Sequence, residues 1–284
     1  MRTFLKATWA RAYAAAGGLR RQHAGKLVVL TFHRVRPAGE QPPPRPMRNL
    51  EVDADDFRRL LCWLRARYQP VALGDWLDFA AALPAPSFAI TFDDGWADNA
   101  DHAWPILREL QIPATIFLAT GAVAERTPFW WQTAGLSDAE IERRKTQPPV
   151  PAGNAAPSAD FLTWAQINAM GAEGLITFGA HGHRHLLLDQ VSAADALADI
   201  RQCWSLLRQN VRAGLLPVLA WPNGNARDDL TPALQELGLR AAFSAARGAV
   251  ATPAAARWRL PRNNVDRQLS RQPELWPWLM MRAK

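Results

Sequence analysis

The chain has 284 residues, of which 49% are apolar and 21% charged, a composition that fits one soluble globular domain and excludes disordered and fibrous classes. Lys and Arg outnumber Asp and Glu by 33 to 26, so the formal net charge is +7. A basic balance suits anionic partners in general, but the sequence contains no nucleic-acid-binding motif, so we expect no nucleic-acid partner.

The chain begins with a basic extension, residues 1–25. Lys6 and Arg11 interrupt its apolar residues before the core of a signal peptide can form. No run of 18 apolar residues occurs that would predict a membrane span. We therefore expect a cytoplasmic protein, and the basic ends favour a peripheral contact with the inner membrane.

From residue 26 to 268, short apolar runs alternate with longer amphipathic segments, a pattern typical of β-α units around a parallel sheet. The predicted strands are 27–32, 87–92, 114–119, 175–179, 218–221 and 241–244. Helical spacing predicts helices over 54–68, 100–110, 163–173, 193–210 and 231–237. Cys62 and Cys203 fall in two of these helices, where a free cysteine is usually a small buried side chain.

Three segments depart from this alternation. Residues 37–48 are rich in proline and are expected to form a loop, and residues 128–160 are expected to form a Pro-rich insertion on the rim of the domain. The C-terminal segment 269–284 is rich in Trp, and it either lies at a membrane interface or caps the domain. No internal repeat or long linker suggests a further domain.

Several predicted strands end abruptly in residues that can bind a metal or move a proton. These residues are His33 after the first strand, Asp93 and Asp94 after the second, and His181, His183 and His185 after the fourth. In a parallel β/α barrel the carboxyl ends of the strands open on one face, so these side chains are predicted to converge. His23 and His102 lie elsewhere in the pattern and are assigned to the surface.

Adjacent carboxylates at Asp93 and Asp94 repel each other unless a cation lies beside them. Asp94, His181 and His185 together offer one carboxylate and two imidazoles, which suits zinc, with cobalt, nickel or iron as alternatives. Asp93 would then take a proton from water as a general base. Asp-Asp-Gly is also an ordinary turn, and the histidines can belong to a solvated loop. We favour the metal site because both clusters end apolar runs and supply complementary ligands.

Thr91-Phe92-Asp93-Asp94-Gly95 and Gly179-Ala180-His181 through His185 resemble the two metal-site motifs of the polysaccharide deacetylases, the NodB-homology carbohydrate esterases. The resemblance extends from about residue 26 to residue 265. It implies an α/β fold, a distorted (β/α) barrel of about seven strands in a single domain. It also implies that Asp93 is the general base and that the metal ligands are Asp94, His181 and His185.

Two positions depart from the commoner pattern of that family. Gly182 stands where the family usually has Ser or Thr, which removes one side-chain hydrogen bond from the ligand loop. No histidine follows His185, whereas many members carry their general-acid histidine near the C-terminus. The opening segment 30–35 resembles that of the circularly permuted subgroup, which implies His33 as the general acid. The alternative is that His33 is packed and hydrogen-bonded in the barrel mouth.

Other segments also resemble that subgroup. In that subgroup, one stretch lines the substrate groove and offers a backbone N–H to an oxyanion. This stretch corresponds here to Trp221, Pro222, Asn223 and Gly224. Arg262 also matches, and it either holds Asp93 ionised through a charge-assisted pair or forms a surface ion pair. In the rim insertion, Phe129-Trp130-Trp131 either stacks on sugar rings or forms a small core of its own.

The sequence therefore predicts a metal-dependent hydrolase of linear amide bonds that removes an N-acetyl or other N-acyl group from an amino sugar. The substrate would be a polysaccharide or glycan precursor, as in exopolysaccharide or cell-envelope glycan biosynthesis. Two alternatives stay open, a deformylase or deacetylase of a lipid-linked sugar at the inner membrane and a non-catalytic carbohydrate-binding descendant. The expected plan is an extension (1–25), a barrel (26–268, with the insertion 128–160) and a tail (269–284).

Overall fold

The computed structural model describes residues 2–37, 39, 50–78, 83–126, 128–129, 132 and 158–284. Most of the two Pro-rich segments, 37–48 and 128–160, lies outside the described residues. Within the described part, no helix is both long and apolar enough to span a bilayer.

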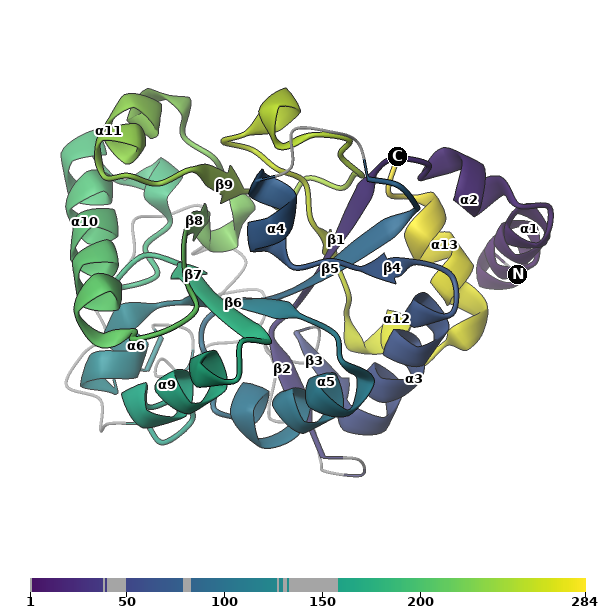
Figure 1. Ribbon diagram of the computed structural model, residues 1–284, viewed down its shortest axis with the longest axis horizontal. Helices are drawn as coiled ribbons and strands as arrows, with labels where there is room; N and C mark the ends of the chain where they lie inside the picture. Colours follow the sequence, from purple (N-terminus) through teal and green to yellow (C-terminus); the bar gives the residue numbers. More distant parts are fainter. Residues whose placement is uncertain are drawn as a thin grey trace.

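A curved sheet of parallel strands forms the centre of the molecule (Figure 1). Its strands in sheet order are β10 (Asn263–Asn264), β1 (Leu27–Phe32), β5 (Ser87–Phe92), β6 (Ala114–Leu118), β7 (Ile176–Ala180), β8 (Leu215–Ala220) and β9 (Ala241–Phe243). Every residue of β1, β5, β6 and β9 is buried, which explains why these strands are continuous apolar runs in the sequence. Outside this path, β4 (Gln69–Pro70) pairs with β5, and β2 (Arg34–Arg36) pairs with β3 (Glu51–Asp53).

One short segment connects the two ends of the sheet. On one side, the Leu260 N–H donates to Ala242 O at 2.9 Å, next to β9. On the other side, Asn263 of β10 lies opposite Leu30 of β1. Segment 260–265 therefore bridges the gap between the last and first strands of the barrel. The sequence pattern did not predict β10, because a two-residue strand has no periodicity to detect.

Helices surround the sheet (Figure 1). They are α1 (Arg2–Ala15), α2 (Gly18–Gln22), α3 (Ala54–Arg65), α4 (Leu73–Asp78), α5 (Trp104–Leu110), α6 (Thr120–Glu125), α9 (Trp164–Ala172), α10 (Ala193–Asn210), α11 (Thr231–Glu236), α12 (Arg267–Ser270) and α13 (Trp276–Met281). Short helical turns are η2 (Asn99–Ala103), η3 (Leu188–Gln190), η4 (Pro222–Gly224), η5 (Asp228–Leu230), η6 (Pro253–Ala256) and η7 (Pro273–Leu275). The predicted helices are confirmed as α3, α5, α9, α10 and α11, and η2, a π-helical turn, precedes α5. The chain thus forms the predicted single-domain, distorted (β/α) barrel.

The helices begin where the sequence supplies a cap. At the start of α9, the Thr163 side chain accepts a hydrogen bond from the Gln166 N–H, and the Gln166 side-chain oxygen accepts one from the Thr163 N–H at 2.9 Å. At the start of α10, the Ser192 side chain accepts from the Asp195 N–H at 3.1 Å. Each cap satisfies N–H groups that the first helical turn leaves without a partner.

Two burial predictions were wrong. Cys62 is exposed, because it points away from the buried stripe of α3, which Leu60, Leu61 and Leu64 form. His23 is fully buried instead of lying on the surface. Its Nε2 is 2.7 Å from Ala283 O and its Nδ1 is 3.0 Å from the Tyr68 hydroxyl. Cys203 is buried, as predicted.

The C-terminal segment folds back onto the barrel. Trp276, Leu279 and Met280 are buried, and the Trp276 indole N–H donates to Leu269 O at 3.1 Å. Helix α13 packs against α1 and α2. Of the two interpretations of segment 269–284, the structure favours the cap over an exposed membrane-interface segment.

Candidate active site

The carboxyl ends of β1, β5 and β7 bring the predicted polar side chains together. Asp93 Oδ2 lies 4.0 Å from His33 Nε2 and 3.9 Å from His181 Nε2. Asp94, His181 and His185 form the group that could hold a metal ion, with ligand atoms all within 4.8 Å of one another. The convergence expected from a parallel barrel is therefore present at one end of the sheet.

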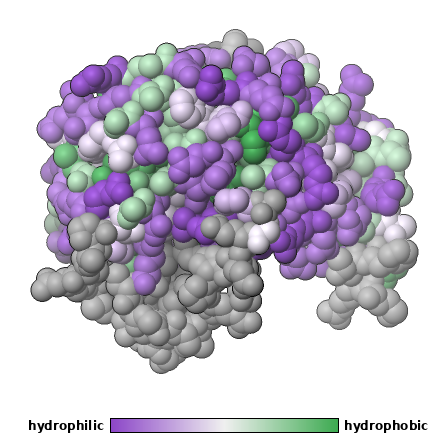
Figure 2. Space-filling model, turned by 90° about the horizontal axis from the view of Figure 1, so that it is seen from below, coloured by the Kyte–Doolittle hydropathy of each residue, from purple (hydrophilic) through white to green (hydrophobic). Residues whose placement is uncertain are grey.

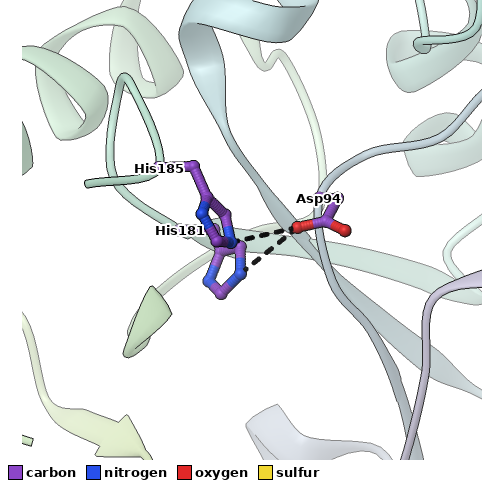
Figure 3. Close-up of side chains that lie close together, drawn as sticks. All are labelled: Asp94, His181 and His185. Atoms are coloured by element: carbon purple, nitrogen blue, oxygen red, sulfur yellow. Dashed lines mark ion pairs between the residues drawn. The ribbon is translucent and has the colours of Figure 1, made fainter. Parts of the chain in front are cut away.

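The geometry of Asp94, His181 and His185 fits a divalent cation. Asp94 Oδ1 lies 3.5 Å from His181 Nε2 and 3.4 Å from His185 Nε2. Dashed lines in Figure 3 mark these two ion pairs. Ligand atoms held tetrahedrally at zinc distances lie about 3.4 Å apart. Asp94 Oδ1 is buried and accepts no hydrogen bond from the described residues, so its charge points toward the space that a cation would fill.

Contacts behind the candidate ligands fix their orientation. His181 Nδ1 lies 2.8 Å from Ala220 O at the end of β8. Since a carbonyl can only accept, Nδ1 carries the proton and Nε2 keeps its lone pair for a metal. On the other ligand, Asp94 Oδ2 accepts a 2.9 Å hydrogen bond from the Trp96 indole N–H. The Trp96 contact was not predicted from the sequence.

Two of the candidate ligands adopt backbone conformations that non-glycine residues rarely use. Asp94 has φ of 77° and His185 has φ of 52°. Such left-handed conformations store strain and persist where the surrounding structure enforces them, often at functional sites. At Asp94 the preceding and following residues are tied down, because the Asp93 N–H donates to Phe32 O and the Gly95 N–H donates to Asp93 O, both at 3.0 Å.

The charges of the site favour an anionic Asp94 and a neutral His185. Burial alone would raise the pKa of Asp94, but His181, His185 and His33 outweigh burial and hold that pKa well below its usual range. Burial lowers the pKa of His185 to about 4 despite the opposing charge of Asp94. Burial would also lower the pKa of His181, but Asp93 and Asp94 outweigh it and raise that pKa. A metal needs the neutral imidazoles and the ionised carboxylate.

Arg262 makes a buried, two-pronged ion pair with Asp93. Its guanidinium donates to Asp93 Oδ1 at 2.6 Å and to Oδ2 at 2.8 Å. Burial would raise the pKa of Asp93, but Arg262, His181 and His33 outweigh it and lower that pKa. Arg262 is itself held by a hydrogen bond to Ser244 O and lies over the Phe117 ring. The surface-pair alternative is therefore wrong, because Arg262 is only 3% exposed.

The His33 ring lies on the open side of Asp93. Its side chain keeps 17% exposure, compared with 5% for Asp93. The backbone is anchored, since Asn99 Nδ2 donates to His33 O at 2.9 Å, while ring atom Nδ1 makes no hydrogen bond to the described residues. Burial lowers the pKa of His33, and Asp94 and Asp93 oppose that effect. This arrangement differs from a histidine tied by hydrogen bonds into the barrel mouth.

Asp199 of α10 holds the loop that connects the two candidate histidine ligands. Its carboxylate accepts from the His183 N–H at 2.8 Å and from the Arg184 N–H at 3.0 Å. Gly182 has φ of 75°, and a Cβ there would lie 2.7 Å from Asp199 Oδ2. The side chain absent at Gly182 is thus replaced by a carboxylate from another element.

Asp199 was not predicted from the sequence, although a signal was present. The buried residues Ala196, Ile200, Cys203 and Leu207 follow helical spacing along α10, and Asp199 lies on the same face. A charged residue on an otherwise apolar stripe indicates a buried polar contact.

His183 is buried and serves the loop rather than the metal group. Its Nδ1 lies 3.0 Å from the Thr120 hydroxyl, and its Nε2 lies 2.9 Å from Gln202 Nε2 and 3.1 Å from Glu125. The Gly121 N–H donates to His183 O at 2.8 Å. The alternative of a solvated loop is therefore wrong, since α6 and α10 both hold this segment.

The segment predicted to line a substrate groove lies beside the ligand loop. A Cβ on Gly182 would be 3.6 Å from Pro222. Trp221 is fully buried and donates its indole N–H to Trp258 O at 2.9 Å, so its ring belongs to the core. The backbone N–H groups of Trp221 and Gly224 are used within the fold, donating to Phe243 O and Trp221 O. Asn223 is exposed, which leaves its N–H as the candidate oxyanion donor.

Phe129 belongs to a small aromatic cluster. It packs on Trp96 and Phe161, with ring centroids 5.5 and 5.1 Å away, and lies 5.1 Å from the His185 ring. For this residue the core interpretation is favoured over an exposed sugar platform. Trp130 and Trp131 lie outside the described residues.

Comparison with known families gives the decisive similarity. Residues 80–242, more than half of the chain, match the polysaccharide deacetylase family. The chain belongs to this family. As a polysaccharide deacetylase it is a hydrolase that acts on amide bonds, which confirms the predicted enzyme class.

Individual deacetylases extend the likeness. Poly-beta-1,6-N-acetyl-D-glucosamine N-deacetylase from Staphylococcus aureus is 25% identical over 253 residues, which cover 83% of this chain and 77% of the relative. The Staphylococcus epidermidis protein of the same name is 26% identical over 257 residues, with 83% and 77% coverage.

Two solved structures share the fold. The Streptococcus pyogenes deacetylase PplD, in complex with acetate, superposes with a TM-score of 0.65 at 20% identity and covers 90% of this chain and 96% of its own. IcaB from Ammonifex degensii superposes with a TM-score of 0.64 at 22% identity and the same coverage. At these identities the likeness supports the barrel fold.

Proposed function

We propose that this deacetylase uses a divalent cation, zinc by preference, to remove N-acetyl groups from N-acetylglucosamine residues of a β-1,6-linked polymer. The observation that carries the proposal is the Asp94, His181 and His185 group beside an Asp93 that Arg262 keeps ionised. The names of the staphylococcal relatives support the polymer as substrate. Zinc is preferred because two imidazoles and one carboxylate leave a coordination position open for catalysis.

Asp94, His181 and His185 would hold the cation. When bound, the cation supplies a Lewis acid that polarises the amide carbonyl and makes water a usable nucleophile near neutral pH. Asp93 takes the proton from the attacking water, since each of its oxygens retains a lone pair beyond the one that Arg262 occupies. Arg262 keeps Asp93 anionic and correctly oriented.

Two further groups complete the proposed reaction. His33, the more exposed ring on the other side of Asp93, protonates the leaving amine as the C–N bond breaks. The Asn223 N–H, adjacent to Pro222 and the ligand loop, donates to the oxyanion. Pro222, Gly224 and the backbone of Trp221 shape this side of the groove.

The test compares variants by both metal content and acetate release from β-1,6-linked N-acetylglucosamine oligomers. Asp93→Asn should retain the metal and lose activity by about 10²–10⁴-fold. His181→Ala should lose both. Asp101→Asn, an exposed aspartate after the same strand, is the matched control and should change neither.

Three results would contradict the proposal. Full activity in Asp93→Asn would remove its role as base, and active protein without stoichiometric metal would remove the cofactor. Equal release of acetate from β-1,4-linked oligomers would remove the linkage preference but leave the deacetylase assignment intact.

A further inference from the structure

Helix α1 presents the most exposed large apolar side chains of the described residues. Leu5 is 60% exposed and Trp9 is 59% exposed, and their i, i+4 spacing places them on one face of the helix. Figure 1 shows α1 at the edge of the molecule, beyond α13. In Figure 2, hydrophilic residues cover most of the face shown, with hydrophobic residues scattered among them.

The two sides of α1 have different roles. Ala7 and Ala10 are buried, 6% and 0% exposed, and α1 packs against α13 through this side. At 3.6 residues per turn, Lys6 and Arg11 project about 100° and about 120° from Leu5, on opposite sides. Both are exposed. Among the described side chains, Leu5 and Trp9 therefore form a narrow apolar strip on the outward face of α1, with Lys6 to one side of Leu5 and Arg11 to the other.

Trp9 is held in its outward position by neighbouring rings. Tyr13 stacks against it with centroids 6.1 Å apart, and Trp278 of α13 meets it edge-on at 6.3 Å. The Lys6 ammonium lies 5.5 Å from the Trp278 ring centroid. Tryptophan has an apolar ring and a polar N–H, so a tryptophan that neighbouring rings hold in place suits the boundary between water and lipid.

The surrounding charge is almost entirely positive. No Asp or Glu occurs before Glu40 in the sequence, while Arg20 and Arg21 add to the cations of α1. Arg20 and Arg21 are both exposed on α2, which packs against α1. The acidic residue of η7, which also contacts α1, is Glu274. Such a surface attracts an anionic partner.

We propose that the outward face of α1 docks on an anionic lipid bilayer. Leu5 and Trp9 enter the interface, and Lys6 and Arg11 pair with lipid headgroups on either side. A second copy of the chain is a poorer occupant, because pairing this face with itself brings like charges together across a small apolar strip. The proposal is independent of the substrate and metal proposed above.

The test is sedimentation of the full chain with vesicles of phosphatidylcholine alone or with added phosphatidylglycerol. The wild type should bind only the anionic vesicles, and binding should weaken as salt screens the charges. Leu5→Gln with Trp9→Gln should abolish most binding. Lys6→Gln with Arg11→Gln should weaken it about fivefold for each cation removed. The single variant Leu5→Gln keeps the ring contacts of Trp9, so α1 should stay packed against α13. If it also weakens binding, the effect of the double variant does not come from misplacement of α1.

The control removes the same charge elsewhere. Arg201→Gln with Arg208→Gln alters two exposed arginines of α10, on the opposite side of the molecule in Figure 1, and should leave binding nearly unchanged. All variants should retain acetate release from soluble oligosaccharides. Equal weakening by both charge-removal pairs, or no binding to anionic vesicles, would overturn the proposal. So would a concentration-dependent dimer that the Leu5→Gln, Trp9→Gln variant abolishes, since a second copy would then cover this face.

Discussion

The Arg262 guanidinium donates hydrogen bonds to both carboxylate oxygens of Asp93, at 2.6 and 2.8 Å, although the two residues are 169 positions apart in the sequence. The contact exists because segment 260–265 bridges β9 and β1, which places Arg262 directly beside the end of β5. Both side chains are buried, 3% and 4% exposed. A buried carboxylate with this partner stays ionised, which is the state that a general base requires.

Loss of the Arg262 charge should weaken the base and shift its pH dependence. Because Arg262 lowers the pKa of Asp93, Arg262→Gln raises that pKa, so the acidic limb of kcat/KM moves to higher pH. The rate near neutral pH should fall by about 10²-fold or more. Arg262→Lys keeps the positive charge, so its acidic limb should shift less than that of Arg262→Gln.

The pH dependence of kcat/KM distinguishes this role of Arg262 from a contribution to the stability of the fold alone. Arg259→Gln breaks a comparable but exposed pair with Asp228 and should leave the profile in place. An Arg262→Gln protein that is folded and has an unmoved acidic limb would show that Arg262 does not set the ionisation of Asp93.

Chelation should remove activity and lower thermal stability together. A cation that binds the folded site stabilises it by mass action, so zinc addition should raise the Tm of the metal-free protein in a concentration-dependent way. Asp94→Asn should lose most of this stabilisation, and Asp101→Asn should keep it. The measurement is a thermal melt across a zinc titration; equal stabilisation of Asp94→Asn and the wild type would place the metal elsewhere.

Removal of the Asp199 carboxylate should loosen the ligand loop. Asp199→Ala leaves the buried N–H of His183 and the part-buried N–H of Arg184 without their acceptor, which should cost about 1–3 kcal/mol for the His183 group and less for the Arg184 group. Asp199→Asn keeps one acceptor and should stay folded, with metal affinity reduced about 10–100-fold. The checks are a denaturant titration and competition for zinc with a chelator.

Asp195→Asn is the matched control for Asp199, because Asp195 lies on the same helix but is exposed. It should retain metal affinity. Unchanged zinc affinity in Asp199→Asn would mean that other contacts suffice to hold His181 and His185 in place.

Acid should destabilise the contact between the two ends of the chain. Burial lowers the pKa of His23, despite the opposing hydrogen bond to Ala283 and with help from Lys26. The unfolded chain therefore binds a proton more readily, with a pKa of about 6.5. The stability contribution of neutral His23 is full above that value and is lost as the pH falls toward the lower folded pKa.

The measurement is the unfolding free energy of wild type and His23→Gln between pH 8 and pH 5. The wild type should lose more stability over this range than His23→Gln does. Parallel pH dependence in the two proteins would show that His23 does not carry this sensitivity.

Much of the fold and the core of the candidate site followed from local sequence. The six predicted strands appeared within a few residues of their expected bounds, because buried parallel strands are continuous apolar runs. Asp94, His181 and His185 could be grouped because each follows such a run, and parallel strands end on the same side of a barrel. Residues far apart in the sequence thus became neighbours because each follows the end of a parallel strand.

Tertiary structure decided which partners those residues have. The pair between Arg262 and Asp93 depends on the bridge that closes the barrel, and the support of Asp199 depends on how α10 packs under the ligand loop. His23 is buried because the C-terminal segment folds over it, although its local sequence is that of a surface turn. The sequence alone determined the spacing of apolar residues along each strand and helix, and the kinds of side chain that could bind a metal, because these are local properties. The contacts that hold Asp93, His181 and His23 join distant segments, and only the packing of the whole chain decides them.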